Sequence, residues 1–163
     1  MLDLGNALLT WKEDACAILN FGLVDRMMKT VIGITGGTCS GKTTFAQRLI
    51  KKIGSEKALV ISQDAYYLDA SSIPLDEQKR RNYDHPSAFE NQLLVEHLDA
   101  FKAGRSIPQF TYDYERHTRV VTGKQLMPKA VILVEGIMVL EAKELRKRFD
   151  IRFSLMLLQT SGY

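Results

Sequence analysis

The sequence predicts an α/β fold: an open, mostly parallel β-sheet with helices on both faces and a β-hairpin insertion. Three short apolar runs rich in β-branched residues have the length of buried strands, and they cover residues 31–35, 58–61 and 130–134. The first run leads through a glycine-rich turn into a segment with helical periodicity. Strands that alternate with helical segments indicate parallel pairing.

The glycine-rich turn fits the pattern G-x-x-x-x-G-K-S/T, the phosphate-binding loop (P-loop) of nucleotide-triphosphate enzymes. Its residues are Gly36, Gly37, Thr38, Cys39, Ser40, Gly41, Lys42 and Thr43, with Thr44 next in the helix. Glycines let the backbone approach phosphates closely, and the N–H groups of the loop and helix start face the anion. We expect Lys42 to reach the β- and γ-phosphates and Thr43 to offer its hydroxyl to Mg²⁺. The alternative is a chance glycine turn.

Bulk properties set the class of protein. The 163 residues include 22 basic and 19 acidic side chains, and a formal charge of +3 is too mild to indicate a nucleic-acid partner. Neither of the two cysteines, Cys16 and Cys39, has metal-site spacing, and a disulfide at Cys39 would block the loop. No apolar run approaches the ~18 residues of a membrane helix, and the N-terminus does not resemble a signal peptide. We therefore expect a cytoplasmic, single-domain protein with no membrane or nucleic-acid partner.

An acidic residue, Asp64, follows the second predicted strand. A helix is predicted from about Thr43 to Ile53, ended by Gly54, and the run at 58–61 is the second strand. Asp64 follows that strand, where ligands bind in open α/β sheets, and it could accept a proton from a substrate hydroxyl. A turn or N-cap role for Asp64 is equally compatible with its position.

A polar stretch, residues 68–81, is predicted to be a loop or short helix. Ser87 to Glu90 fits a capping box, so we expect a helix to start there, to bury Leu93, Leu94, Leu98 and Phe101, and to stop at Gly104. Asp84 lies beside that helix start, where its carboxylate could bind ribose hydroxyls or could serve only as a local cap.

The hairpin is predicted at about residues 107–122. Phe110, Tyr112 and Tyr114 alternate, which gives one strand face an aromatic character, and His117 and Arg119 follow. Rings beside His and Arg suit a nucleobase, by stacking and edge hydrogen bonds. A half-buried hairpin with a wet outer face fits the pattern equally well.

The third strand ends in Glu135, which we expect to hold Mg²⁺ or its water ligands together with the phosphate loop. Residues 141–149 are predicted to form a basic surface helix, and residues 150–158 begin as a fourth strand.

Together these pieces resemble the uridine kinase (uridine–cytidine kinase) family of P-loop NTPase-type kinases. The resemblance covers about residues 28–153, and its most specific parts are residues 82–89 and 112–119, with 36–43, 63–67 and 134–137 in the expected order. It implies transfer of the γ-phosphate of ATP or GTP, with Mg²⁺, to the 5′-hydroxyl of uridine or cytidine in pyrimidine salvage.

The resemblance also implies a role for each site residue. Asp64 resembles the catalytic base, which makes that role our working hypothesis, and Asp84 resembles the ribose-binding acid. Tyr112, Tyr114 and His117 resemble base-pocket residues. Lys42, Thr43 and Glu135 resemble the phosphate and magnesium set. A homo-oligomer stays open, because nothing in the sequence decides the oligomeric state.

Both ends of the chain depart from the family pattern. Residues 1–27 form an N-terminal extension outside the core, in which residues 4–16 could make a short amphipathic helix, and we hypothesise that translation begins naturally at Met27 or Met28. The kinase domain, residues 28–153, is expected to be incomplete, because the family continues with an arginine-rich lid helix. Residues 154–163 are an atypical tail, which a single-base frameshift near the Phe153 codon would explain.

Three other functions fit the sequence less well. A related small-metabolite kinase, for nicotinamide riboside or ribulose phosphate, fits residues 82–89 and 112–119 less well. A GTPase is disfavoured because the chain has no Asn-Lys-x-Asp motif. The alternative that is not an enzyme is a remnant that binds nucleotide but has little turnover.

Overall fold

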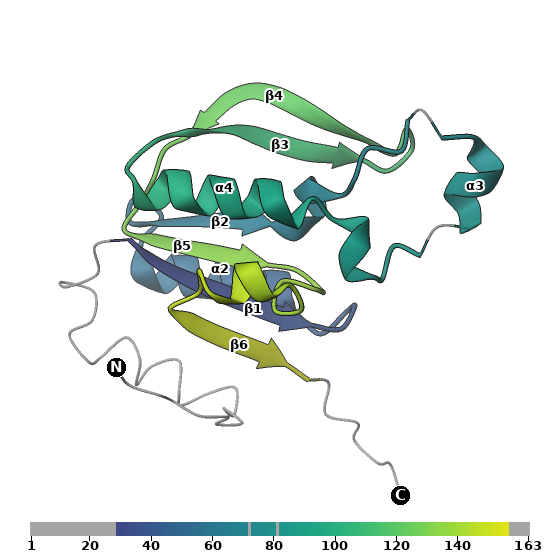
Figure 1. Cartoon of the computed structure of the whole chain (residues 1–163). Helices are drawn as coiled ribbons and strands as arrows, with labels where there is room; N and C mark the ends of the chain where they lie inside the picture. The colour runs from purple at the N-terminus through teal and green to yellow at the C-terminus, as the bar shows by residue number, and fades with distance from the viewer. Residues whose placement is uncertain (1–28, 72, 81, 157–163) are drawn as a thin grey trace, which may run out of the picture.

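A parallel sheet forms the centre of the molecule (Figure 1). The computed structural model describes residues 29–71, 73–80 and 82–156. The strands are β1 (Thr30–Gly36), β2 (Ala58–Ser62), β5 (Val131–Glu135) and β6 (Ile151–Leu155). Their order is β2-β5-β1-β6, and each neighbouring pair is parallel. The predicted open parallel α/β sheet is confirmed, and each of the predicted strands is present.

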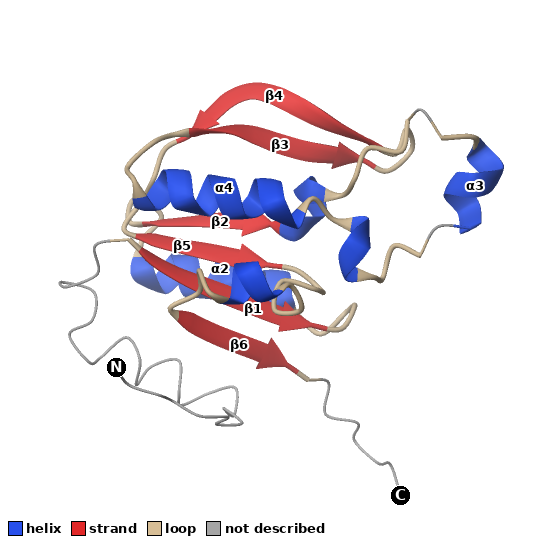
Figure 2. Ribbon diagram, in the orientation of Figure 1, coloured by secondary structure: helices blue, strands red, loops and turns tan. Residues whose placement is uncertain are grey.

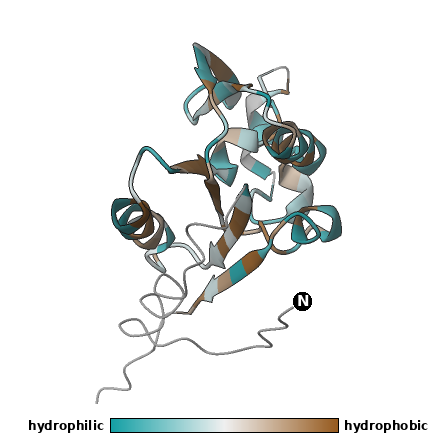
Figure 3. Cartoon of the chain, turned by 90° about the vertical axis from the view of Figure 1, so that its left-hand side faces the viewer, coloured by the Kyte–Doolittle hydropathy of each residue, from teal (hydrophilic) through white to brown (hydrophobic). Residues whose placement is uncertain are grey.

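Helices cover both faces of this sheet, as predicted (Figure 2). Helix α2 (Lys42–Ile53) packs Ala46, Leu49 and Ile53 against one face, and α4 (Asn91–Lys102) with α5 (Lys143–Arg146) covers the other. Alternate residues of β5 supply the two cores, because successive side chains of a strand point to opposite faces. In Figure 3 the strands of the sheet, brown where their residues are hydrophobic, lie between the helices of the two faces.

The predicted hairpin consists of β3 (Ile107–Asp113) and β4 (Thr118–Leu126), paired antiparallel. It lies over α4 on the side away from α2 (Figure 1). Phe110 of β3 stacks on His97 of α4, with ring centroids 5.4 Å apart, and meets Tyr66 edge to face. The hairpin is therefore joined to the main core and is not a free arm.

The predicted start of α4 is wrong by about four residues. Ser87 lies inside the 3₁₀ turn η3 (Pro86–Ala88), which His85 caps by accepting a hydrogen bond from the Ser87 N–H. Phe89 is then extended and forms a bridge with Tyr67, so the helix starts only at Asn91. A capping box is a local signal, and here the pairing of Phe89 with a distant segment overrides it.

The basic helix predicted at residues 141–149 is reduced to the short α5, Lys143–Arg146. Phe149 is buried in the core, and the Asp150 side chain accepts a hydrogen bond from the Val31 N–H at 2.8 Å. The chain must leave the helix early to make these contacts and to enter β6. The polar stretch at 68–81 contains the short helix α3 (Leu75–Arg80), as one of its two predicted forms.

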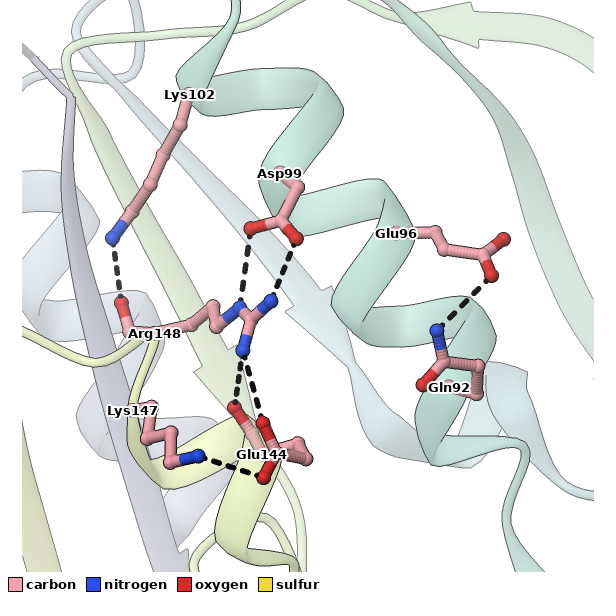
Figure 4. A network of polar contacts seen from close by, with 7 residues as sticks. All are labelled: Gln92, Glu96, Asp99, Lys102, Glu144, Lys147 and Arg148. Carbon is pink, nitrogen blue, oxygen red and sulfur yellow. Dashed lines mark hydrogen bonds and ion pairs between the residues drawn. The ribbon is translucent and has the colours of Figure 1, made fainter.

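Ion pairs connect α4 to the segment that directly follows α5 (Figure 4). The Arg148 guanidinium binds both carboxylate oxygens of Asp99, at 3.2 and 2.9 Å, and also reaches Glu144. Lys102 donates to the backbone carbonyl of Arg148 at 3.0 Å. The arginine holds the pKa of Asp99 below its usual range, mainly through its hydrogen bonds.

Several expectations fall outside the described residues. These are the amphipathic helix near the N-terminus, the start at Met27 or Met28, and residues 157–163 of the tail. Ser154 and Leu155 belong to β6, and the frameshift and the domain boundaries stay predictions. Within the described part of the chain, no helix has the length and apolar character needed to cross a membrane.

Candidate active site

The carboxyl ends of β1, β2 and β5 lie side by side at one end of the central sheet. Ser62 of β2 is opposite Glu135 of β5, and Glu135 is opposite Ile34 of β1. The phosphate loop, Asp64 and Glu135 therefore emerge together. The segment after β1 leads to α2 on one face, and the segment after β5 leads to α5 on the other. This divergence is a topological switch point, where open α/β sheets bind ligands.

The loop from Gly36 to Thr43 has the backbone of an anion cradle. Cys39 and Gly41 adopt left-handed conformations, with φ of 61° and 84°, and Gly41 is the N-cap of α2. A Cβ at Gly36 would lie 2.6 Å from Ser40 Oγ and from the Leu155 carbonyl oxygen, so a side chain does not fit there. A Cβ at Gly37 would meet no atom within 4 Å, which leaves room for a ligand beside the backbone.

Two polar side chains of the loop fit a bound phosphate. Lys42 is only 9% exposed, and its ammonium donates to the Gly37 carbonyl at 2.8 Å, so it is held over the loop. Ser40 Oγ is buried and has no hydrogen-bond partner. A buried hydroxyl of this kind is costly unless a ligand or water satisfies it. Thr38 and Thr44 are exposed beside the loop.

Thr43 and Glu135 form the pair predicted to serve the metal. The Thr43 hydroxyl donates to Glu135 Oε2 at 3.5 Å, although the residues are 92 positions apart. Across residues 29–71, 73–80 and 82–156, no three His, Cys, Asp or Glu side chains gather as a metal site. Two oxygen donors nevertheless suit Mg²⁺, which keeps several waters and takes further oxygens from nucleotide phosphates.

Asp64 lies in the 3₁₀ turn η2 (Gln63–Tyr66) that follows β2. Ser62 caps this turn by accepting a hydrogen bond from the Asp64 N–H, so the alternative N-cap role of Asp64 is wrong. The Asp64 carboxylate instead accepts a hydrogen bond from the Tyr114 hydroxyl at 3.1 Å. Burial, together with the charge and hydrogen bond of Asp64, raises the pKa of Tyr114 well above its ordinary value, so the phenol stays protonated and remains a donor.

The aromatic face predicted for the hairpin meets η2 and residues 82–89. Tyr67 stacks on Phe89 with ring centroids 4.3 Å apart, and it lies 5.2 Å from the ring of Tyr112. Tyr112 and Tyr114 meet edge to face at 5.3 Å. Burial, followed by the charges of Asp64 and Asp84, raises the pKa of Tyr67 to about 12. The residues attributed to a base pocket are thus close together around Tyr67.

His117 and Asp84 lie at the border of this cluster. His117 stacks on Tyr83 at 5.5 Å, and its Nδ1 is hydrogen-bonded to the Tyr83 hydroxyl at 3.1 Å. Asp84 is exposed, and its backbone N–H is bound by the side chain of Asn82 at 3.0 Å. His85, and not Asp84, caps η3. The alternative role of Asp84 as a local cap is therefore wrong, whereas ribose binding stays a prediction.

Gln63 is a site residue that the sequence analysis missed. Its side chain is fully buried, its Oε1 accepts a hydrogen bond from the Met138 N–H at 3.0 Å, and its Nε2 reaches Asn91 Oδ1 at 3.5 Å. It thereby ties the segment after Glu135 to the turn that carries Asp64. The sequence contained one signal for this role, because Gln63 stands directly between a predicted buried strand and Asp64.

Arg119 follows the aromatic residues that suit a nucleobase, and the structure gives it protein partners. Its Nε donates to the Ala65 carbonyl and its Nη2 to the Tyr67 carbonyl, each at 3.1 Å, and its Nη1 pairs with Glu90 at 2.8 Å. The side chain thus binds backbone groups on the C-terminal side of Asp64 together with the Glu90 carboxylate.

The fold and this loop define an α/β P-loop protein of the kinase class. The model of the phosphoribulokinase / uridine kinase family matches residues 31–158. Uridine kinases of Chloroflexus aurantiacus and Halalkalibacterium halodurans are 43% and 45% identical over 122 residues. In both cases the match covers 75% of this chain and 58% of the relative. The chain thus spans less than two thirds of the length of these relatives.

Solved structures show the same fold. A candidate fructose transport system kinase from Silicibacter matches 88% of this chain and 74% of its own, with a TM-score of 0.69 and 18% identity. A candidate uridine kinase from Bacillus stearothermophilus matches 86% of this chain and 79% of its own, with a TM-score of 0.61 and 21% identity. The chain belongs to the phosphoribulokinase / uridine kinase family.

Proposed function

We propose that this protein transfers the γ-phosphate of ATP or GTP to the 5′-hydroxyl of uridine or cytidine. The products are the nucleoside 5′-monophosphate and the nucleoside diphosphate, as in pyrimidine salvage. One observation carries the proposal: Asp64, held by Tyr114, emerges at the sheet edge where the phosphate loop and the Thr43–Glu135 pair meet. The relatives described as uridine kinases favour a pyrimidine nucleoside over other alcohols.

Each residue has a defined task in this reaction. Lys42 and the backbone N–H groups of Gly36 to Thr43 bind the phosphates and offset their charge, while Thr43 and Glu135 hold Mg²⁺, which supplies further charge neutralisation. The Asp64 carboxylate accepts the proton of the 5′-hydroxyl. A bond forms between the 5′-oxygen and the γ-phosphorus, and the bond from that phosphorus to the β,γ-bridging oxygen breaks.

The substrate contacts follow the aromatic cluster around Tyr67. Asp84 binds ribose hydroxyls, and Tyr112, Tyr114 and His117 border the nucleobase. Rings stack on a base, and the His117 nitrogens can make hydrogen bonds to its edge. We also propose a cytoplasmic location, on the composition, and a small-molecule substrate in place of a nucleic acid.

The test is phosphoryl transfer by the purified chain, followed with radiolabelled ATP or GTP and uridine, cytidine or nicotinamide riboside. We expect transfer to uridine or cytidine and a loss of about a hundredfold or more in kcat for Asp64→Asn. The same variant should keep its affinity for ATP, because Asp64 lies outside the phosphate loop. Transfer to nicotinamide riboside alone would reject the substrate, and full activity of Asp64→Asn would reject the base.

A nucleotide-binding remnant is the competing function. It predicts thermal stabilisation by ATP without transfer to any of the three nucleosides, so the same two measurements separate it from the kinase.

A further inference from the structure

The turn that carries Asp64 is held from outside by the hairpin. Three hydrogen bonds run from β4 and from the segment between β3 and β4 to residues 64–67: one from Tyr114 to the Asp64 carboxylate and two from Arg119 to backbone carbonyls. The donors are about 50 positions away in sequence from their acceptors. The η2 turn is only four residues long, so its own hydrogen bonds fix it weakly.

Tyr114 acts on the carboxylate directly. Its hydroxyl donates to Oδ2 of Asp64 at 3.1 Å, which fixes the rotation of the carboxylate and leaves Oδ1 for another donor. Its ring meets the rings of Tyr112 and Tyr67 edge to face, with centroids 5.3 and 6.4 Å apart, so the ring has two aromatic neighbours although the residue is 58% exposed. A hydrogen bond to a charged group is worth more than one between neutral groups.

Arg119 acts on the backbone on the C-terminal side of Asp64. It binds the carbonyls of Ala65 and Tyr67 at 3.1 Å each, so two of its nitrogens clamp the turn directly after the base. The third nitrogen pairs with Glu90 at 2.8 Å, and the guanidinium lies 5.2 Å from the ring centre of Phe110. The side chain is 14% exposed. With its three nitrogens occupied and its faces partly covered, Arg119 is a clamp and not a reader of a nucleobase.

We propose that Tyr114 and Arg119 are positioning residues that set the place and orientation of the Asp64 carboxylate for proton transfer. The inference rests on the proposed function and adds a second role to the hairpin, beside the nucleobase contacts. A general base must lie within hydrogen-bond reach of the proton that it accepts, and displacements of about 1 Å are costly. A hairpin anchored to the core through Phe110 is a rigid support for that purpose.

The first test is a set of double-mutant cycles on kcat with Asp64→Asn as the common partner. Tyr114→Phe removes only the hydroxyl and is expected to lower kcat about 3- to 10-fold, and Arg119→Met about 10-fold or more, each with little change in KM for ATP. In the Asp64→Asn background both losses should disappear, because there is no carboxylate left to position. Arg119→Lys keeps the charge but not the planar fork, so it should behave like Arg119→Met.

Arg116→Lys is the matched control, since Arg116 is 82% exposed, and it should match the wild type.

A second test needs no turnover. Tetranitromethane modifies the phenolate of tyrosine, and Asp64 raises the pKa of Tyr114. Asp64→Asn removes that charge and should speed nitration of Tyr114 about 3- to 10-fold, because the lower pKa increases the phenolate fraction. Nitration of Tyr83, whose hydroxyl is bound to His117, serves as the internal reference and should not change.

The outcomes are distinguishable. Losses by Tyr114→Phe and Arg119→Met that persist in full in the Asp64→Asn background would overturn the inference, as would an unchanged nitration rate of Tyr114. Absence of transfer by the wild type to uridine and cytidine would instead overturn the proposed function, and full activity of Asp64→Asn would reject Asp64 as the base, whatever the nitration result. If Arg119→Met fails to fold because Glu90 loses its partner, Tyr114→Phe and the nitration rate still decide.

Discussion

Gly136 has no room for a side chain, because the neighbouring Gln63 occupies the space beside it. A Cβ at Gly136 would lie within about 2.5 Å of both Cβ and Oε1 of Gln63, and 3.0 Å from a methyl group of Val139. Gln63 is fully buried and fixes the Met138 N–H, so it cannot move aside without breaking that hydrogen bond. The glycine directly after Glu135 therefore allows the two strand ends of the site to approach each other.

Gly136→Ala should lower the free energy of unfolding by about 1–3 kcal/mol, the usual cost of an overpacked core position. Gly37→Ala is the matched control, since its Cβ would meet no atom within 4 Å and its φ is not positive. The measurement is urea denaturation of the two variants and the wild type. Equal destabilisation by both substitutions would contradict the role given to Gln63.

The sequence indicated the chemistry of some site residues but not the contacts of others. Lys42 and Thr43 were identifiable because a local pattern fixes their chemistry, and the structure brings Thr43 to Glu135 as expected. The partners of Arg119 were not predictable, because the carbonyls of Ala65 and Tyr67 lie more than 50 positions away. A residue type indicates which bonds a side chain can make, but only the fold determines with what.

At the scale of elements, the pH dependence of stability should come partly from the contact between α4 and η2. His97 of α4 is 8% exposed and its Nδ1 is hydrogen-bonded to the Tyr66 hydroxyl at 2.8 Å. Burial lowers the pKa of His97, and the charge of Arg119 adds to the effect while Glu96 opposes it. The folded protein thus holds His97 neutral at a pH where the unfolded chain already binds the proton.

The sign follows from proton binding. The contribution of His97 to stability is complete above the unfolded pKa of about 6.5 and is lost as the pH falls below it. Urea denaturation at pH 7.5 and pH 5.5 should show a larger loss of stability on acidification for the wild type than for His97→Gln. The same loss in both proteins would mean that another group is responsible.

The ion pairs between α4 and α5 offer a second prediction for the elements. Arg148→Met breaks a bidentate contact to Asp99 and should cost roughly 1 kcal/mol of unfolding free energy, near the upper limit for partly exposed pairs. Lys147→Met is the control: both partners of the Lys147–Glu144 pair are 55% exposed, and stability should not change measurably. High salt should reduce the effect of Arg148→Met. An effect that is the same at low and high salt would point to lost packing.

Elements were predictable where one local signal decided them. Helix α2 begins at Lys42 and ends at Ile53 before Gly54, within one residue of the expected bounds, because the phosphate loop and the glycine fix both ends. Helix α4 starts later than the capping box indicated, because Phe89 is taken into contact with Tyr67. The predicted basic helix at 141–149 is cut short by the burial of Phe149. These errors share one cause, a tertiary contact stronger than a local preference.

At the scale of the whole molecule, the strand order decides which residues meet. The sequence predicted parallel strands but contained no signal for the order β2-β5-β1-β6. That order places β5 between β2 and β1, so Glu135 lies between the ends that carry Asp64 and the phosphate loop. The residues of the candidate site could thus be proposed from the sequence, whereas their arrangement depends on a topology that no local pattern encodes.

Binding of nucleotide should therefore stabilise the whole domain, because the loop is continuous with the central strand β1 and with α2. At a ligand concentration of about 100 Kd the gain is about 2.7 kcal/mol, which corresponds to a rise in Tm of roughly 5–11 °C for a chain of this length. ATP with Mg²⁺ should produce this shift in a thermal scan of the wild type and of Asp64→Asn. Lys42→Ala should abolish it, since Lys42 is the buried cation of the loop, and EDTA should reduce it. An undiminished shift in Lys42→Ala would place the nucleotide elsewhere, and the assignment of the loop would then have to be abandoned.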